Sequence, residues 1–302
     1  MPNLTLLVGP PGSGKSTLAN KLALTRVSQD DQGRDGHMEV FNKAITENKD
    51  IVIDRMGFVK NQRERYLKPA KEAGYSTEII VLHESYQTCK ERMANRTGHP
   101  TIKDETAANQ ALNMFFSKYE RVEDSEADKV TRIWPEGDKP SAIICDLDGT
   151  LCNCEHRRHF VRPNIITPGF KKNWKAFFDG IPNDPVNEFC ADILRKMAGK
   201  RLIVYLSGRD DNQRKMTKRW LEENNLDKFV DETPYRNGVY TADLFMRNRQ
   251  DSRQDYIVKE ILLDFEVLTR FTPYFMLDDR DQVVKMWRRR GFTCLQVAEG
   301  DF

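Results

Sequence analysis

The chain has 302 residues, of which 39% are hydrophobic and 31% charged, so it is long enough for two domains with apolar cores. Lysine and arginine total 48 and aspartate and glutamate total 46, which gives a formal net charge of +2 at pH 7. This small charge argues against a long basic nucleic-acid footprint, so a nucleic-acid substrate is expected to be held near its end by a few arginines. Nothing in the sequence resembles a signal peptide or a membrane span, and we therefore expect a cytoplasmic protein.

The first motif follows a short apolar run over 4–8 and has the spacing G-x-x-x-x-G-K-S from Gly9 to Ser16. Glycines in such a loop let backbone N–H groups turn toward phosphate oxygens, because no Cβ obstructs the turn. Lys15 can reach the β- and γ-phosphates, and the Ser16 hydroxyl can ligate Mg²⁺. A helix expected over 17–22 would direct its N-terminal dipole at the anion, whereas the alternative is a chance glycine-rich turn. The motif predicts that ATP and Mg²⁺ are bound by Gly12, Ser13, Gly14, Lys15, Ser16 and Thr17.

The next strand is expected at 26–28 and leads into two carboxylates, Asp30 and Asp31. The carboxyl end of a strand in an open α/β sheet faces the cleft where ligands bind. Asp30 can there accept the proton of an attacking hydroxyl, which makes it the candidate base of a phosphoryl transfer. Arg34, four residues further on, could hold an anionic acceptor through its forked guanidinium group. A polar surface turn is the alternative interpretation of this stretch.

Helices and strands alternate through the rest of the first half, which predicts a parallel sheet covered by helices. Helices are expected at 38–47, 60–74, 85–95 and 107–119, and strands at 50–54 and 76–83. The strand at 50–54 ends in Asp54, a position comparable to the Walker B carboxylate, which serves Mg²⁺ or the acceptor. The turn-rich stretch 135–140 breaks both helix and strand, so we place a domain boundary between 1–138 and 139–302.

A mobile lid is expected near 92–105, where a helix ends in the sequence N-R-T-G-H-P. Arg92 and Arg96 are four residues apart and therefore lie on one helical face. In small P-loop kinases the segment at this place closes over ATP, and its arginines stabilise charge on the transferring phosphate. A solvated basic face is the alternative interpretation.

The second half begins with a hydrophobic strand from Ser141 that ends in the sequence D-L-D-G-T over 146–150. Two carboxylates two residues apart at the end of a strand point to the same side. This D-x-D-G-T sequence resembles the signature of the haloacid-dehalogenase phosphatase superfamily. The resemblance implies that Asp146 attacks phosphorus as the nucleophile, and that Asp148 protonates the leaving oxygen and then activates water. It also implies that Mg²⁺ lies between these two carboxylates.

Three further segments occur in the order that this superfamily requires. They are Ser207-Gly208-Arg209 after a strand, Lys259 on a helix, and Asp278-Asp279 at the end of another strand. By the resemblance, the serine hydroxyl and the arginine would hold the substrate phosphate, and the lysine would neutralise the transition state. The two aspartates would complete the Mg²⁺ site. Taken one at a time, the segments could instead be a hairpin serine, a surface lysine and an acidic strand end.

A cluster of zinc-ligand types lies directly after this signature. It consists of Cys152, Cys154, His156 and His159. The spacing is tighter than in a usual structural zinc site, where two short pairs are separated by a loop. We favour local packing in a reduced protein over zinc binding.

A basic and aromatic stretch, K-K-N-W-K-A-F-F over 171–178, could stack on nucleic-acid bases. However, Trp174, Phe177 and Phe178 have the i, i+3, i+4 spacing that is typical of a packed helix face. We therefore predict that the three rings pack in the core.

A P-loop kinase followed by an aspartate-based phosphatase resembles the polynucleotide kinase-phosphatases, most closely those of the T-even-phage type. The resemblance lies in the domain order, the length and the ending G-F-T-C-L-Q-V-A-E-G-D-F. The resemblance implies an α/β fold of two domains, a parallel-sheet P-loop kinase over 1–138 and a Rossmann-like haloacid-dehalogenase-type phosphatase over 139–302. It implies that Arg34 grips the acceptor's 3′ phosphate, although the phage type has its arginine one residue earlier. The substrate-positioning residues of the phosphatase would be Arg157, Arg247 and Asp255.

The resulting hypothesis is a nucleic-acid end-healing enzyme. It would transfer the γ-phosphate of ATP to a 5′-hydroxyl of RNA or DNA, and it would remove a 3′-phosphate or a 2′,3′-cyclic phosphate. Because no K-x-D-G ligase motif occurs in the sequence, we expect a separate ligase as a functional partner. From the resemblance we also expect a homo-oligomer that binds no membrane, in the host cytoplasm if the chain is phage-encoded.

Two other functions remain open at this point. The chain could combine a nucleoside or sugar kinase with a metabolite phosphatase. Alternatively, the P-loop half could be a nucleotide-gated scaffold that regulates the phosphatase. Asp30 and the pair Arg92 and Arg96 argue against the scaffold, because a switch needs no acceptor-side base.

Overall fold

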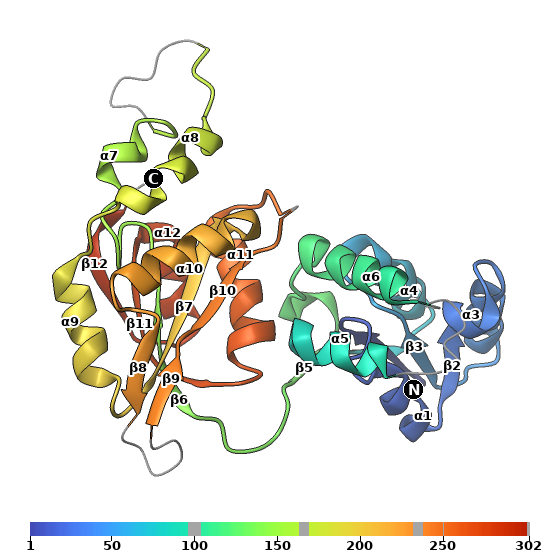
Figure 1. Ribbon diagram of the computed structural model, residues 1–302. Helices are drawn as coiled ribbons and strands as arrows, with labels where there is room; N and C mark the ends of the chain where they lie inside the picture. Colours follow the sequence, from blue (N-terminus) through green and yellow to red (C-terminus); the bar gives the residue numbers. More distant parts are fainter. Residues whose placement is uncertain (96–103, 163–168, 232–237, 250, 301–302) are drawn as a thin grey trace. The chain divides into compact units, whose positions relative to one another are not determined.

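The computed structural model describes residues 1–95, 104–162, 169–231, 238–249 and 251–300 (Figure 1). By their internal contacts, the residues form two compact units. Unit 1 consists of Met1–Gly137 with Asp264–Thr269, and unit 2 consists of Asp138–Leu263 with Arg270–Phe302. Among the helices within the described ranges, none is long and apolar enough to cross a bilayer.

The core of unit 1 is a parallel sheet of five strands in the order β2-β3-β1-β4-β5. The strands are β1 (Asn3–Val8), β2 (Thr25–Ser28), β3 (Ile51–Asp54), β4 (Ser76–Leu82) and β5 (Lys129–Ile133). The central strand β1 is buried from its second residue onward and is apolar there except at Thr5, as expected for a parallel strand covered on both faces. The sequence did not predict β5, because this edge strand has no fully buried residue and hence no apolar run.

Six helices accompany this sheet in the described part of unit 1 (Figure 1). They are α1 (Lys15–Leu22), α2 (Gln29–Gln32), α3 (Gly36–Thr46), α4 (Lys60–Glu72), α5 (Tyr86–Ala94) and α6 (Glu105–Lys118). Helix α1 packs Ala19 into an apolar cluster with Leu7 of β1 and Val52 of β3. Because α1 is anchored there, the glycine-rich loop before it is held at the carboxyl end of β1.

Unit 2 is built on a second parallel sheet of five strands, in the order β10-β7-β6-β11-β12. The strands are β6 (Ser141–Cys145), β7 (Leu202–Asp210), β10 (Asp243–Arg247), β11 (Thr272–Arg280) and β12 (Cys294–Gly300). An antiparallel pair, β8 (Lys228–Asp231) with β9 (Gly238–Thr241), forms a separate hairpin. The carboxyl ends of β6, β7 and β11 are neighbours at one edge of the sheet, so the residues that follow them are brought together.

The helices of unit 2 are α7 (Glu155–Arg158), α8 (Trp174–Asp179), α9 (Glu188–Met197), α10 (Arg214–Glu223), α11 (Asp255–Leu262) and α12 (Asp281–Arg289). The last helix shows why they pack as they do: Val283, Val284 and Trp287 of α12 are at most 1% exposed, while charged residues cover its other face. Helices α7 and α8 lie side by side at the top of Figure 1, away from α9 and α12. The two parallel sheets confirm the predicted α/β fold.

Candidate active sites

The glycine-rich loop of unit 1 has the backbone that a phosphate cradle requires. Gly12 and Gly14 have φ angles of 83° and 95°, in the left-handed region that glycine adopts without strain. A Cβ on Gly12 would also lie 2.8 Å from the carbonyl oxygen of Cys89. Ser13 Oγ is buried and has no hydrogen-bond partner among the described residues, and Lys15 Nζ donates to the Pro10 carbonyl at 2.7 Å. A buried hydroxyl without a partner and a nearby ammonium group fit the phosphates of a nucleotide.

A cavity of about 970 Å³ opens beside this loop. It is lined by loop residues that include Ser13, Lys15 and Ser16, and by Asp30 and Arg92. The predicted base and the predicted phosphate-binding loop therefore face the same space. Arg92 contacts the loop directly, since its Nη1 donates to the Gly12 carbonyl at 3.3 Å and pairs with Glu84 at 2.9 Å.

One predicted residue of the kinase half does not line this cavity, and another lies outside the described residues. Arg34 is exposed and is not among the described residues that line it. Arg96 and most of the predicted lid, residues 96–103, lie outside the described residues.

Arg55 lines the same cavity, and sequence reasoning missed it. It follows the last residue of β3, and its Nη1 donates to Tyr66 Oη at 2.8 Å and contacts His37 Nε2 at 3.4 Å. The adjoining Asp54 also lines the cavity, but Arg26 donates to its Oδ2 from Nε at 3.0 Å and from Nη2 at 2.5 Å. The available signal in the sequence was the Asp-Arg pair at the end of a strand.

In unit 2, three buried carboxylates meet where β6 and β11 end. Asp146, Asp278 and Asp279 each place one carboxylate oxygen within 4.8 Å of the other two, and all three are at most 7% exposed. Lys259 of α11 reaches the same point: its Nζ lies 2.9 Å from Asp146 Oδ1, 2.9 Å from Asp278 Oδ2 and 3.5 Å from Asp255 Oδ2. The nucleophile, the lysine and the acidic pair predicted from separate motifs are thus in contact.

The pKa values of these buried carboxyl groups reflect an excess of negative charge where they meet. Burial raises the pKa of Asp146 well above its usual range, Lys259 opposes this, and Asp278 and Asp279 add to it. Burial, followed by the charge of Asp278, raises the pKa of Asp279 to about 6. One lysine does not compensate several buried carboxylates, and oxygen ligands are those that Mg²⁺ prefers. The residues present therefore fit a divalent cation.

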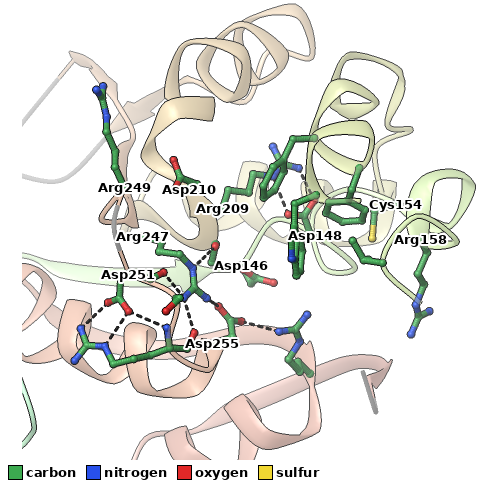
Figure 2. A pocket seen from close by; sticks show the side chains of 18 residues that line it. Asp146, Asp148, Cys154, Arg158, Arg209, Asp210, Arg247, Arg249, Asp251 and Asp255 are labelled. Atoms are coloured by element: carbon green, nitrogen blue, oxygen red, sulfur yellow. Dashed lines mark hydrogen bonds and ion pairs between the residues drawn. The ribbon is translucent and has the colours of Figure 1, made fainter. Parts of the chain in front are cut away.

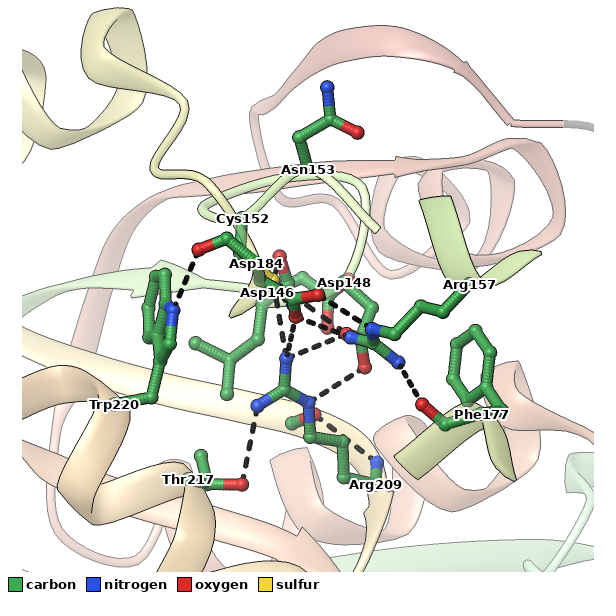
Figure 3. Close-up of polar contacts among 12 residues, drawn as sticks. Asp146, Asp148, Cys152, Asn153, Arg157, Phe177, Asp184, Arg209, Thr217 and Trp220 are labelled. Carbon is green, nitrogen blue, oxygen red and sulfur yellow. Dashed lines mark hydrogen bonds and ion pairs between the residues drawn. The ribbon is translucent and has the colours of Figure 1, made fainter. Parts of the chain in front are cut away.

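Asp148 is held by two buried arginines (Figure 3). Arg209 donates to it from Nε at 2.8 Å and from Nη2 at 2.7 Å, and Nη2 of Arg157 donates to Oδ1 of the same carboxylate. Although burial alone would raise it, the charges of Arg209 and Arg157 hold the pKa of Asp148 well below its usual range. Asp148 is therefore ionised in this environment.

A residue that sequence reasoning missed, Asp184, connects the two arginines. It is 5% exposed, and it accepts from Arg157 Nε at 2.6 Å and from Arg209 Nη2 at 3.3 Å (Figure 3). Two guanidinium groups and two carboxylates thus form a charge-balanced cluster. Asp184 lies in a loop sequence, N-D-P, that gave no sign of burial.

The other predicted residues of the phosphatase half are also placed near the strand ends. Ser207 is 1% exposed, and its Oγ accepts from the Arg209 backbone N–H at 3.2 Å. Arg247 donates from Nε to the Gly208 carbonyl at 2.8 Å and from Nη2 to Asp255 Oδ1 at 3.2 Å. A Cβ on Gly208 would overlap that same carboxylate, so glycine is required for the close approach. Figure 2 shows Arg247 beside Asp255 in the cavity of this site.

This cavity has a volume of about 500 Å³ and joins the catalytic candidates to an aromatic wall. Asp146, Asp148, Arg209, Arg247 and Asp255 line one part, and Trp174, Phe177 and Phe178 of α8 line another. The prediction that α8 buries its rings is right for Phe177, which is 7% exposed, and wrong for Trp174, which is 48% exposed. The helical spacing correctly placed the rings on one face, but only the inner ring of that face meets the core.

The cysteine and histidine cluster does not come together as four ligands. The described group of potential metal ligands that includes Cys152 combines it with Asp148 and Asp184. Both of these carboxylates already accept hydrogen bonds from Arg157 and Arg209. Two guanidinium groups at this point disfavour a further cation.

Comparison with known proteins adds independent information. A family described as "Polynucleotide kinase PNKP phosphatase domain" matches residues 140–302, and one described as "AAA domain" matches residues 33–121. A protein of the Autographa californica nuclear polyhedrosis virus named "Putative bifunctional polynucleotide kinase/RNA ligase" is 26% identical over 317 residues, which cover 94% of this chain and 41% of that protein. "Transcription factor bHLH140" of Arabidopsis thaliana is 31% identical over 108 residues, or 32% of this chain and 12% of that protein.

The chain therefore spans well under half the length of these curated relatives. Among solved structures, a chain of the "Pnkp1/Rnl/Hen1 RNA repair complex" is similar over 100% of this chain and 97% of its own, with 25% identity and a TM-score of 0.41. The first of the two family matches covers more than half of the sequence and includes every phosphatase motif described above. The chain belongs to the family of the polynucleotide kinase PNKP phosphatase domain.

Proposed function

We propose that the chain is a nucleic-acid end-healing enzyme, which phosphorylates 5′-hydroxyl ends with ATP and removes 3′-phosphate or 2′,3′-cyclic phosphate ends. The observation that carries the proposal is the contact of Lys259 with Asp146 and Asp278, on a chain whose other unit has a separate phosphate-binding loop. If the two sites acted on the same phosphate group, one would remove what the other adds. They cooperate when one adds phosphate at a 5′ end and the other removes it at a 3′ end.

In the phosphatase, residues 139–302, Asp146 would attack phosphorus through a carboxylate oxygen. The bond from phosphorus to the 3′-oxygen breaks, and Asp148 delivers a proton to the leaving oxygen. Water then attacks the aspartyl phosphate, Asp148 takes its proton, and inorganic phosphate leaves. Since its two arginines hold Asp148 ionised, it is poised for the second step. A substrate phosphate monoanion, whose second pKa lies near ~6, can bring the proton that the first step needs.

The surrounding residues have supporting roles in this proposal. Lys259, whose own pKa is raised above its usual range because Asp146 and Asp278 outweigh the effect of burial, keeps its charge and would stabilise the phosphoryl group in transit. Ser207 would hold the substrate phosphate near the nucleophile. Arg209, which the sequence also assigned to the phosphate, is buried with its guanidinium group on Asp148 and Asp184 and would act by orienting Asp148. Mg²⁺ would be held by Asp146, Asp278 and Asp279, and would offset the negative charge that otherwise repels the substrate. Asp148, which the sequence also placed at the metal, has its carboxylate oxygens engaged by Arg157 and Arg209 instead.

Three residues besides these are proposed to position the phosphatase substrate: Arg157, Arg247 and Asp255. Arg157 acts through its bond to Asp148. Arg247 and Asp255 pair with each other at 3.2 Å on the cavity wall, where a guanidinium group can meet a nucleotide phosphate or sugar.

In the kinase, residues 1–138, the loop from Gly12 to Thr17 would hold the triphosphate of ATP, and Ser16 would ligate Mg²⁺. Lys15, Arg92 and Arg96 would stabilise charge on the γ-phosphate during transfer, with 92–105 as the lid. Asp30 would take the proton from the 5′-hydroxyl, because it faces the same cavity as Lys15. Arg34 is proposed to bind the acceptor phosphate.

The proposal includes a cellular setting. The healed ends, a 5′-phosphate and a 3′-hydroxyl, are the substrates of nucleic-acid ligases, so a ligase is proposed as the functional partner. A homo-oligomeric state and a cytoplasmic location complete the proposal.

The decisive experiment is an end-labelling assay with γ-labelled ATP on matched RNA and DNA oligonucleotides with 5′-hydroxyl ends, alongside mononucleosides and simple sugars. A parallel assay measures phosphate release from 3′-phosphorylated oligonucleotides. We expect label on oligonucleotides and phosphate release from their 3′ ends. Label on nucleosides or sugars alone would instead identify a small-metabolite kinase. ATP binding without transfer to any hydroxyl would identify a nucleotide-gated scaffold.

A further inference from the structure

Trp174 is an exposed tryptophan on the wall of the phosphatase cavity. It is 48% exposed, whereas Trp220 and Trp287 of the same unit are each 1% exposed. A single exposed ring on a protein surface needs no explanation. This ring, however, lines the same cavity as Asp146 and Asp148, so it faces the place where a substrate must lie.

The Trp174 ring is held in place by the two other aromatic residues of α8. Phe178 stacks with it at a centroid distance of 5.9 Å and an interplanar angle of 26°, and Phe177 meets it edge-on at 5.8 Å and 88°. Asn173 caps the helix by accepting the Ala176 backbone N–H at 3.0 Å. Trp174 is thus a preorganised flat ring, and the Nζ of the exposed Lys172 also lies over it, 5.6 Å from the centroid.

The same helix is tied to the catalytic carboxylate. The guanidinium carbon of Arg157 lies 4.1 Å from the Phe177 ring centroid, and Arg157 also donates to the Phe177 carbonyl at 3.2 Å. Arg157 in turn donates to Asp148 (Figure 3). The position of the aromatic wall is therefore fixed relative to the proposed site of phosphate cleavage.

The rest of the cavity is lined by charged residues of both signs, six arginines and five aspartates. Arg247 lines it, as do Arg158 and Arg249, which Figure 2 shows to be well separated from each other. Arg249 has a side chain that is 65% exposed. A ligand that fills this cavity of about 500 Å³ must combine anionic groups for the arginines with a flat apolar group for the ring. A nucleotide with a 3′-phosphate has these groups, whereas a sugar phosphate has no flat group.

We propose that Trp174 stacks on the base of the nucleotide that carries the 3′-phosphate, and that the phosphatase site consequently takes unpaired 3′ ends. The inference rests on the proposed function and specifies its substrate. A base can stack on a protein ring only when it is out of the duplex. Every base has a π-face, so the site tolerates any of the four bases at the end.

The test uses two oligonucleotides that carry the same 3′-phosphate and differ only at the last sugar, which bears a base in one and is abasic in the other. Phosphate release is measured for the full chain and for W174A, W174L and W174F. Stacking on one base predicts that W174A and W174L lower kcat/KM by about 10- to 100-fold on the base-bearing end, mostly through KM. On the abasic end they should match the wild type, and W174F should retain most of the base preference.

Phe189 of α9 supplies a matched control, because it is 53% exposed in the same unit and does not line the cavity. F189A should leave both substrates unaffected. W174L keeps an apolar side chain at this position but has no π-face, so it separates stacking from folding should W174A fail to fold. A duplex with a blunt 3′-phosphate end should be a poorer substrate for the wild type than a single strand. In W174L the ratio of kcat/KM between the single strand and the blunt duplex should be smaller.

Three results would overturn the inference. One is an equal loss of kcat/KM on base-bearing and abasic ends in W174L, which would mean that the ring only supports the cavity wall. Another is an unchanged kcat/KM of W174L on both ends. The third is equal cleavage of blunt duplex and single-stranded ends by the wild type. If the wild type releases no phosphate from any 3′-phosphorylated oligonucleotide but cleaves a small phosphate ester, the proposed function fails first.

Discussion

The candidate site of unit 2 and that of unit 1 differ in how their charges are compensated. In unit 2, Asp146, Lys259 and Asp278 are at most 7% exposed and contact one another. In unit 1, Asp30 is exposed, and the Arg92 side chain is 52% exposed. The candidate phosphatase site is held together by its own buried ion pairs, whereas the candidate kinase site has exposed charged groups. Substitutions should therefore affect folding and catalysis together in unit 2, and mainly catalysis in unit 1.

The largest expected effect is that of Asp146→Asn. Loss of the nucleophile should lower 3′-phosphatase activity by about 10⁴-fold or more while 5′-kinase activity stays at the wild-type level. Because the replacement removes an excess buried charge, the melting temperature of unit 2 should rise. Phosphate release, end labelling and calorimetry measure the three quantities.

The matched variant in unit 1 is Asp30→Ala, which should lower kinase activity by about 10²- to 10⁴-fold. It should leave phosphatase activity and the melting temperature unchanged, because Asp30 is exposed. Retained kinase activity would show that Asp30 is not the base. Loss of both activities in either variant would contradict two independent sites.

The next effect is structural and concerns Arg209→Met. Without the Arg209 guanidinium group, Asp148 and Asp184 share only Arg157 in a buried environment. This should lower the free energy of unfolding by about 3–5 kcal/mol. Denaturant unfolding measures this loss. Arg92→Gln in unit 1 is the comparison, since an exposed ion pair contributes about 1 kcal/mol or less. Equal losses in the two variants would remove the contrast between the sites.

A pH effect is expected in unit 1 from His83. This ring is 4% exposed and stacks on Trp134 at a centroid distance of 4.4 Å, and burial lowers its pKa from 6.5 to about 4. Between these values the unfolded chain binds a proton that the folded chain excludes, so stability falls as the pH falls from 6.5 toward 4 and levels off below. The full contribution is about 3 kcal/mol at ~1.4 kcal/mol per pKa unit.

The measurement is the free energy of unfolding of the wild type minus that of His83→Phe over this pH range. The difference isolates His83 from carboxylates that titrate in the same range. A difference that does not change with pH would show that the ring is already charged, or equally solvated, in both states.

The smallest expected effect distinguishes two arginines of the kinase site. Arg55 lines the cavity with Asp30, and Arg34 does not. We therefore expect Arg55→Gln to raise the KM for the oligonucleotide acceptor about tenfold, consistent with one charge-assisted hydrogen bond of ~1.5 kcal/mol. Arg34→Gln tests the prediction made from the sequence, and a larger effect there than at Arg55 would restore Arg34 as the acceptor-binding residue.

The sequence predicted what short-range spacing determines. Gly14-Lys15-Ser16 and Asp146-x-Asp148 have fixed geometry because each is a few residues long and follows a strand. The parallel topology then brought Lys259 and Asp278 to Asp146, as the order of motifs implied. Asp146 and Asp278 come together because strand ends in a parallel sheet meet at one edge, and Lys259 reaches them from α11.

The remaining features depend on contacts that no local pattern encodes. Asp184 lies in an ordinary loop sequence, and only its two arginine partners make it part of the site. The exposure of Trp174 depends on which side of a short helix meets the core, which the spacing of its rings does not reveal. Strand β5 was missed because an edge strand with little buried surface resembles a polar loop.

The burial of the thiols has a practical consequence for following conformational dynamics. All six cysteines are buried, with Cys89 in unit 1 and the other five in unit 2. Burial raises the pKa of the Cys89, Cys154, Cys190 and Cys294 thiols to about 12, so the reactive thiolate is scarce at neutral pH. Alkylating reagents will consequently modify these thiols at the rate at which each unit opens. The native chain thus carries a separate chemical reporter of opening in each unit, without introduced labels.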